Sequence, residues 1–381
     1  FSNDEDVIAT GSKIVQKYPK LKPRLDSFPK LFFKSTDKTE RGAFSLQWLP
    51  NSIESRIVEL EPDIINLHWI SGGFTNIKTI AKLKKPIVWT LHDMWAFTGG
   101  CHYSQECDNY KKSCGNCPQI PTKYNVDLSS WVWQRKANSW AKVNGTIVAL
   151  SNWLAKCAAS SPLFKDWRIE IIPNGLDTDI YKPFEQSLVR KNLNLPQDKY
   201  LILFGAENGT ATPRKGFYFL KAALENLSKT NWSNKCELVV FGAAKSNDSS
   251  ELGFKTHYLG RLNDETTISQ VYTAADVFVA PSVQDNLPNT VMESLACGIP
   301  CVAFNIGGMP DMIEHQQNGY LAKPFDIEDL AKGIVWVLEA SNNDNCKLNH
   351  HAREKVERDF TLEIQARRYQ SLFGEILQHS K

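Results

Sequence analysis

The sequence predicts an alternating α/β protein with two parallel sheets, one in each half of the chain. In the second half, short apolar runs of strand length alternate with segments whose apolar residues recur at helical spacing. The first half repeats this order more sparsely. Between the halves, Pro173, Asn174 and Gly175 stand in succession, which is typical of a turn. Because strands joined through helices enter a sheet in parallel, we expect a parallel sheet on each side of this turn.

The expected elements follow from these runs. In the first half we expect strands at 64–67, 86–90 and 146–150, and helices at 77–83 and 131–143. In the second half we expect strands at 201–205, 238–242, 257–259, 276–281 and 301–304, and helices at 217–227, 288–296 and 327–338. A last helical pattern with one broad apolar face covers 361–381.

Composition excludes several classes of protein. The 381 residues carry a net charge of +2, whereas a dedicated nucleic-acid-binding domain is usually strongly basic. No apolar run reaches the ~18 residues that a membrane helix needs. No secretory segment opens the chain, and the cysteines outside one cluster are typical of reduced thiols. We therefore expect a cytoplasmic protein that at most rests on the inner face of the membrane.

Two pairs of charged residues follow strands of the second sheet. Arg214 and Lys215 come after the strand at 201–205 and just before a helix, where cations and free backbone N–H groups suit a diphosphate. Asp285 and Glu293 follow the strand at 276–281, and carboxylates accept hydrogen bonds from vicinal sugar hydroxyls. Loops at the carboxyl ends of parallel strands converge, so these residues predict a site for a nucleotide diphosphate sugar. The alternative for Arg214 and Lys215 is a solvated basic turn. For the acids, the alternative is that Asp285 or Asn286 caps the helix and that Glu293 is a solvated helix residue.

Further contacts are expected from three loops of the same sheet edge. Glycines let a backbone approach a ligand closely, and the remaining residues would contact the base or the sugar. These candidates are Arg261, Leu262, Asn286, Leu287, Pro288, Asn289, Gly307 and Gly308.

In its second half above all, the chain resembles the retaining glycosyltransferases of family 4, which have the GT-B fold of two facing Rossmann-like domains. The resemblance rests on the segments at 172–177, 214–216, 259–262, 281–300, 307–308 and 318–321. It implies an N-terminal acceptor-side domain at 1–175, a donor-binding domain at 176–358 and a helix at 359–381 that returns to the first domain. Such a first domain opens with a strand, a glycine-rich loop and a helix. Nothing before Ile64 has this pattern, so we expect the first βα unit to be missing.

The resemblance also implies an activity and roles for residues. The protein would move a sugar from a nucleotide diphosphate sugar to a hydroxyl of a glycan or lipid-linked acceptor, with retention and without a catalytic metal. Arg214 and Lys215 would bind the diphosphate, Glu293 the ribose and Asp285 the transferred sugar. The family motif has two glutamates with seven residues between them; here the spacing is kept but the first acid is aspartate. Rival interpretations are a non-catalytic sugar-nucleotide-binding or scaffold subunit, and a nucleotide-sugar epimerase of the same fold.

One histidine of the first half is a further catalytic candidate. His92 follows the strand at 86–90, and the family has a histidine beside the donor sugar after the corresponding strand. It would donate a hydrogen bond to a sugar hydroxyl or to the leaving phosphate. The alternative is a structural histidine.

A polar insert at 99–121 holds four of the nine cysteines, Cys101, Cys107, Cys114 and Cys117. The last pair has the two-residue spacing of a zinc knuckle, and four thiolates can close a tetrahedral site. We expect a structural zinc; free thiols and disulfides are the alternatives. Similar inserts occur in some bacterial family 4 sequences, which implies cell-surface polysaccharide synthesis.

The helix after the insert carries both aromatic and basic residues. Trp131, Trp133 and Trp140 alternate there with Arg135 and Lys136. We expect the tryptophans to be mostly core. The alternative is a basic and aromatic face that contacts a lipid-linked acceptor at the membrane surface.

Overall fold

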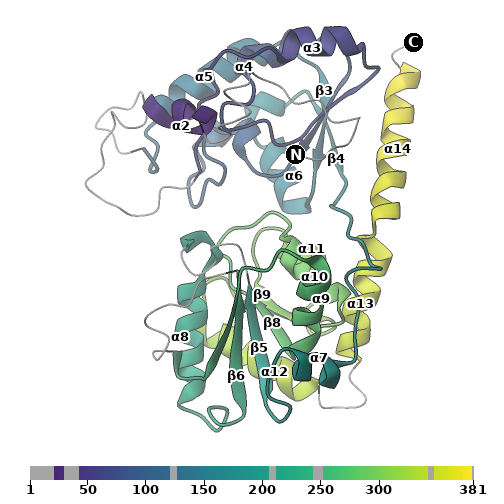
Figure 1. Cartoon of the computed structure of the whole chain (residues 1–381). Helices are drawn as coiled ribbons and strands as arrows, with labels where there is room; N and C mark the ends of the chain where they lie inside the picture. Colours follow the sequence, from purple (N-terminus) through teal and green to yellow (C-terminus); the bar gives the residue numbers. More distant parts are fainter. Residues whose placement is uncertain are drawn as a thin grey trace. The chain divides into compact units, whose positions relative to one another are not determined.

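The computed structural model describes residues 21–29, 43–120, 127–205, 212–242, 252–341 and 347–379. The chain divides into two compact units, one of Phe1–Ile172 with Ser371–Lys381 and one of Pro173–Gln370. Among the described residues, each unit contains one parallel sheet, of four strands in the first and six in the second (Figure 1). The predicted fold class, with a parallel sheet in each half, is confirmed.

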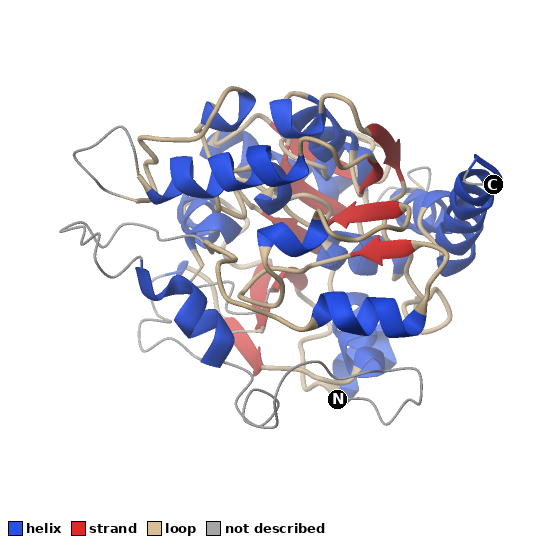
Figure 2. Cartoon of the chain, turned by 90° about the horizontal axis from the view of Figure 1, so that it is seen from above, coloured by secondary structure: helices blue, strands red, loops and turns tan. Residues whose placement is uncertain are grey.

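The first unit contains a sheet in the order β1-β2-β3-β4. Its central strand β2 is buried along its whole length, as expected for a parallel strand covered on both faces. Figure 2 shows helices on both sides of the strands. The elements are α2 (Leu21–Ser27), α3 (Ile53–Leu60), β1 (Ile65–Leu67), α4 (Ile77–Ile80), β2 (Ile87–Leu91), η2 (Trp95–Phe97), η3 (Asn109–Lys111), α5 (Leu128–Trp140), β3 (Gly145–Ala149), α6 (Asn152–Ala159), η4 (Pro162–Phe164) and β4 (Arg168–Ile171).

The second unit contains a sheet in the order β10-β9-β8-β5-β6-β7. In Figure 1, α8 lies on the opposite side of this sheet from α9 and α10. The elements are α7 (Gln186–Asn192), β5 (Tyr200–Gly205), η5 (Pro213–Lys215), α8 (Phe217–Ser228), β6 (Cys236–Phe241), β7 (Thr256–Gly260), α9 (Glu265–Ala274), β8 (Val277–Ala280), α10 (Asn289–Ala296), β9 (Cys301–Phe304), α11 (Met309–Met312), β10 (Gly319–Ala322), α12 (Ile327–Ala340), α13 (Leu348–Asp359) and α14 (Leu362–His379).

The last helix, α14, is shared between the two units. Up to Gln370 it belongs to the second unit, and from Ser371 it belongs to the first. Within the first unit, Glu375 of this helix forms a salt bridge of 2.8 Å with Arg168 of β4. The helix thus contributes to both units, as predicted for a segment that returns to the first domain.

Two strands were not expected from the sequence. β4 lies at the edge of the first sheet, where its charged residues Arg168 and Glu170 face solvent, so it lacks the continuous apolar run of a buried strand. β10 is short and lies at the edge of the second sheet. The expectation of a missing first βα unit falls partly on residues 1–20 and 30–42, which lie outside the described residues.

Among the described residues, no helix is both long enough and apolar enough to cross a membrane.

Candidate functional site

The strand order places a natural ligand position in the middle of the second sheet. β5 is the first strand of this sheet in the chain, and it lies between β6 and β8. From β5 the chain continues outward through β6 and β7, and it then returns to β8 and continues outward in the opposite direction through β9 and β10. The strand order therefore reverses between β5 and β8. In open parallel sheets, ligands bind at the carboxyl ends of strands where the order reverses in this way. The segment with Arg214 and Lys215 follows β5, and the segment with Asp285 follows β8.

The loops that follow β5 and β8 are packed directly against each other. Gly216 has a positive φ of 68°, and a Cβ atom there would lie 1.8 Å from the carbonyl oxygen of Pro281. The backbone N–H of Val283 donates to the carbonyl oxygen of Arg214 at 2.9 Å. Only glycine allows this approach, because any side chain would collide with the facing backbone. The sequence Arg-Lys-Gly therefore positions both cations at the β5–β8 boundary.

Asp285 lies between the two cations. Its Oδ2 atom is 2.8 Å from Nζ of Lys215 and 3.0 Å from a guanidinium nitrogen of Arg214. Ser282 donates a hydrogen bond of 3.3 Å to the same oxygen. Burial opposes ionisation of Asp285, but Lys215 and Arg214 outweigh it, so the pKa of this carboxyl lies below its usual value. In the absence of a ligand, Asp285 is therefore an ionised partner of the cations.

The loop after β9 covers the other side of Asp285. A Cβ atom at Gly307 would lie 2.0 Å from the carbonyl oxygen of Asp285, and the N–H of Gly308 donates to that oxygen at 3.1 Å. The structure thus brings together five predicted residues, namely Arg214, Lys215, Asp285, Gly307 and Gly308.

Glu293 is positioned by a residue that the sequence did not indicate. The hydroxyl of Tyr272, a buried residue of α9, donates to Oε2 of Glu293 at 2.8 Å. Burial raises the pKa of Glu293 to about 7, although the Tyr272 hydrogen bond acts in the opposite direction. The alternative of a solvated helix residue does not fit this environment. Tyr272 lies in an ordinary apolar helical pattern, so the sequence carried no sign of this contact.

The other predicted contacts of the second unit are more scattered. Asn286, Leu287 and Pro288 are buried at the start of α10, whereas Asn289 is exposed and its side-chain oxygen accepts from Asn174 at 3.2 Å. Arg261 is exposed and Leu262 is half-buried. Both follow β7, which is an edge strand separated from β8 by β5 and β6.

In the first unit, His92 is paired with a second histidine. It follows β2, and its Nε2 atom lies 3.0 Å from Nδ1 of His68, which follows the neighbouring strand β1. Burial, and then the proximity of His68, lower the pKa of His92, so the imidazole is neutral near pH 7. The neighbouring Asp93 instead contacts His102, at 2.6 Å, and Trp69, at 3.1 Å.

The four cysteines of the insert line one pocket. All eight described cysteines are free, so no disulfide joins any of them. Burial raises the pKa of Cys114 to about 12 and that of Cys117 to about 11. Among the described residues, no three His, Cys, Asp or Glu side chains are arranged so that they could hold a metal together.

The helix after the insert, α5, divides its aromatic and basic residues between the core and the surface. Lys136 is completely buried and Trp140 is buried, whereas Trp131 is 44% exposed and stacks under Arg135 at 4.3 Å. The tryptophan prediction is thus correct for Trp140 and wrong for Trp131. Lys136 is therefore not part of a membrane-facing surface, whereas Trp131 and the neighbouring Arg135 are at least partly exposed.

Comparisons with known proteins agree with this architecture. Residues 6–180 match the family model described as Glycosyltransferase Family 4, and residues 199–340 match the model described as Glycosyl transferases group 1. The structure of Alr3699/HepE from Anabaena in complex with UDP superposes with a TM-score of 0.60 at 18% identity, covering 84% of this chain and 81% of that chain.

Two curated relatives extend the comparison. The putative teichuronic acid biosynthesis glycosyltransferase TuaC of Bacillus subtilis is 27% identical over 78% of this chain and 72% of its own length. The UDP-Gal:alpha-D-GlcNAc-diphosphoundecaprenol alpha-1,3-galactosyltransferase of Escherichia coli is 24% identical over 52% of each chain. The chain spans about half the length, or less, of the first seven curated relatives. The two family matches together indicate a GT-B glycosyltransferase, and the solved structure has the same fold.

Proposed function

We propose that the chain transfers a sugar from a nucleotide diphosphate sugar to a hydroxyl of a glycan or lipid-linked acceptor, with retention at the anomeric carbon. The observation that carries the proposal is the pair of cations, Arg214 and Lys215, held at the strand-order reversal of the second sheet by the buried Asp285. A diphosphate offers several anionic oxygens, which suit one forked guanidinium and one ammonium group. Both cationic side chains remain partly exposed, so they can be reached from solvent.

The remaining residues have separate tasks in this proposal. Ionised Glu293 accepts hydrogen bonds from the ribose hydroxyls while Tyr272 fixes its orientation. Asp285 positions the cations and accepts from a hydroxyl of the transferred sugar. Backbone groups of Gly307 and Gly308 and the 286–289 segment surround the donor, and Arg261 and Leu262 contact the base.

In the transfer step, the acceptor oxygen forms a bond to the anomeric carbon and the bond from that carbon to the diphosphate oxygen breaks. The acceptor proton passes to the departing phosphate, so no separate base is required. Arg214 and Lys215 stabilise the charge that develops on the diphosphate, and charge stabilisation of this kind is often the largest contribution to a rate. His92 donates a hydrogen bond to the transferred sugar or to the departing phosphate.

The acceptor class follows from the relatives. One acts on a diphosphoundecaprenol-linked sugar by its name, and another is assigned to teichuronic acid synthesis. We therefore propose a role in cell-surface polysaccharide synthesis, with peripheral contact to the inner face of the membrane. The free described cysteines support a reducing, cytoplasmic location.

The test is a panel of UDP-, GDP- and ADP-sugars, first by thermal shift and then by release of the nucleoside diphosphate with and without lipid-linked acceptors. NMR of the product would give the anomeric configuration. One donor should be selected, and its α or β configuration should persist in the product. Donor binding without turnover for any acceptor would favour a sugar-nucleotide-binding subunit, and conversion of the free donor to its epimer would favour an epimerase.

A further inference from the structure

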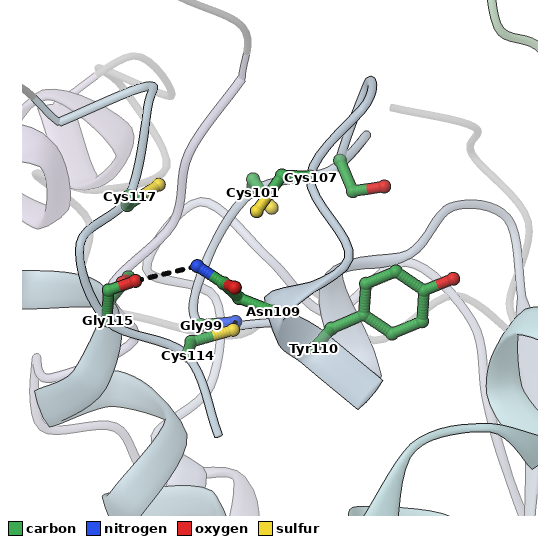
Figure 3. A pocket seen from close by; sticks show the side chains of 10 residues that line it. Gly99, Cys101, Cys107, Asn109, Tyr110, Cys114, Gly115 and Cys117 are labelled. Carbon is green, nitrogen blue, oxygen red and sulfur yellow. Dashed lines mark hydrogen bonds between the residues drawn. The ribbon is translucent and has the colours of Figure 1, made fainter. Parts of the chain in front are cut away.

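The insert of the first unit encloses a small pocket that the proposed transfer reaction does not use. Its lining includes Cys101, Cys107, Cys114 and Cys117, and Figure 3 shows their sulfur atoms turned toward its interior. The cavity volume is about 10 Å³, which is close to the minimum for a single water molecule. The cavity therefore has room for one small ion and for little else.

Backbone N–H groups already point at two of the sulfur atoms. The N–H of Gly99 donates to Sγ of Cys114 at 3.0 Å. The N–H groups of Gln119 and Ile120 lower the pKa of the Cys117 thiol against the effect of burial, and the Ile120 N–H donates to the carbonyl oxygen of Cys117 at 3.0 Å. Hydrogen bonds from N–H groups to sulfur favour thiolate over thiol, and the thiolate is the form that binds a metal.

A buried cation lies next to this cluster. Lys136 of α5 is completely buried, donates to the carbonyl oxygens of Trp95 and Thr98, and lies 3.6 Å from the ring centroid of Trp95. Burial lowers the pKa of Lys136 to about 7, and negative charge on Cys114 or Cys101 would act in the opposite direction. In the part of the chain that the structure describes, no carboxylate lies within ion-pair distance of it. A buried charge is costly unless a counter-charge accompanies it.

We propose that Cys101, Cys107, Cys114 and Cys117 bind one structural Zn²⁺ as thiolates, with Lys136 as the counter-ion of the site. Four thiolates and one divalent cation leave two negative charges, which supply the partner that the lysine lacks. Four sulfur ligands and a tetrahedral site suit zinc, and the Cys114–Cys117 spacing is that of a zinc knuckle.

Zinc binding requires the four cysteine side chains to move closer together. As they stand, the described thiols do not include three that could hold an ion together, so the four side chains must rotate toward one centre as their protons leave. Metal sites commonly form in this coupled way, with binding free energy added to the stability of the fold. The insert is anchored for such closure, because Asp127 caps α5 and accepts from the N–H of Cys117 at 2.7 Å.

The first experiment is metal analysis of the full chain purified without chelators. One zinc per chain is expected in the wild type and in Cys157→Ser, which replaces a half-buried thiol outside the pocket. The double variant Cys114→Ser, Cys117→Ser should lose the zinc. Absence of zinc from the wild type, iron in its place, retention of zinc in the double variant, or a disulfide among the four cysteines would each overturn the proposal.

The second experiment tests the lysine with Lys136→Met, which keeps the length of the side chain and removes its charge. Competition with a chromophoric chelator should show zinc affinity about 10–100-fold weaker, as for other partners that surround metal ligands. The melting temperature of the zinc-free protein should rise, because a buried charge has been removed. If Lys136 served only to bind the carbonyl groups of Trp95 and Thr98, the variant would instead lower the melting temperature of both forms and leave zinc affinity unchanged.

Discussion

The buried carboxylate of Asp285 lies 2.8 Å from the ammonium group of Lys215, and the same oxygen also binds Arg214. Asp285 thus holds the positive charges of Arg214 and Lys215 close together, where the strand order of the second sheet reverses. In the proposed function, a nucleoside diphosphate shares these cations with Asp285, and the length of this side chain sets where they lie.

The first prediction concerns Asp285→Asn, which keeps the shape of the side chain and removes its charge. The free nucleoside diphosphate should bind at least as tightly as to the wild type, because it no longer shares the cations. The intact nucleotide sugar should bind more weakly, because a sugar contact is lost. Calorimetric titration with both ligands measures the difference, with the exposed Glu328→Gln as control. Equal losses for the two ligands would refute the role assigned to Asp285.

The raised pKa of Glu293 predicts that the free energy of unfolding depends on pH. Its pKa in the folded state is about 7, above the usual value of 4.5. The protonated side chain therefore favours the fold below pH 4.5, and this contribution is lost as the pH rises to about 7. It amounts to about 3 kcal/mol at 1.36 kcal/mol per pKa unit.

Urea unfolding at pH 4.5 and pH 8 tests this relation. The wild type should lose more stability across this range than Glu293→Gln, which cannot ionise. The exposed Glu225→Gln should behave as the wild type. Parallel curves for the wild type and Glu293→Gln would mean that Glu293 ionises normally.

The sequence predicted the buried strands of both units but missed one edge strand in each, and the reason is physical. Buried strands such as β5 and β9 are continuous apolar runs bounded by turns, and these patterns are local. The edge strand β4 exposes charged residues and resembles a loop. The pairing of Asp285 with the cations, the burial of Lys136 and the contact of Tyr272 with Glu293 depend on segments far apart in the chain. No local pattern encodes them.

A third prediction concerns the histidine pair. His68 lowers the pKa of His92, so His68→Ala should raise it toward the usual value of 6.5. Burial still acts on His92 in the variant, so the rise should be incomplete. A pH titration followed by NMR of the imidazole resonances measures it. His351→Ala, in the second unit, is the control; an unchanged His92 titration in His68→Ala would show that the two rings do not interact.

A fourth prediction tests the packing of the two loops. Gly216→Ala forces a side chain toward the carbonyl oxygen of Pro281 at a positive φ. It should destabilise the second unit by about 1–3 kcal/mol from backbone strain alone, and weaken donor binding as well. Gly374→Ala is the matched control, since it lies in α14 with open space around it and should stabilise the helix by about 0.5–1 kcal/mol. Denaturant unfolding compares the two, and equal effects would contradict the close approach at Gly216.

Binding of the donor diphosphate by Lys215 is the interaction on which the proposed function depends most. Calorimetric titration of Lys215→Met with the nucleoside diphosphate of the selected donor tests it directly, with Lys229→Met, an exposed lysine beyond α8, as the control. The account predicts a loss of about 1.5–3 kcal/mol of binding free energy for Lys215→Met, the usual value of a hydrogen bond to a charged group, and none for the control. Equal affinities for the two variants and the wild type would contradict it.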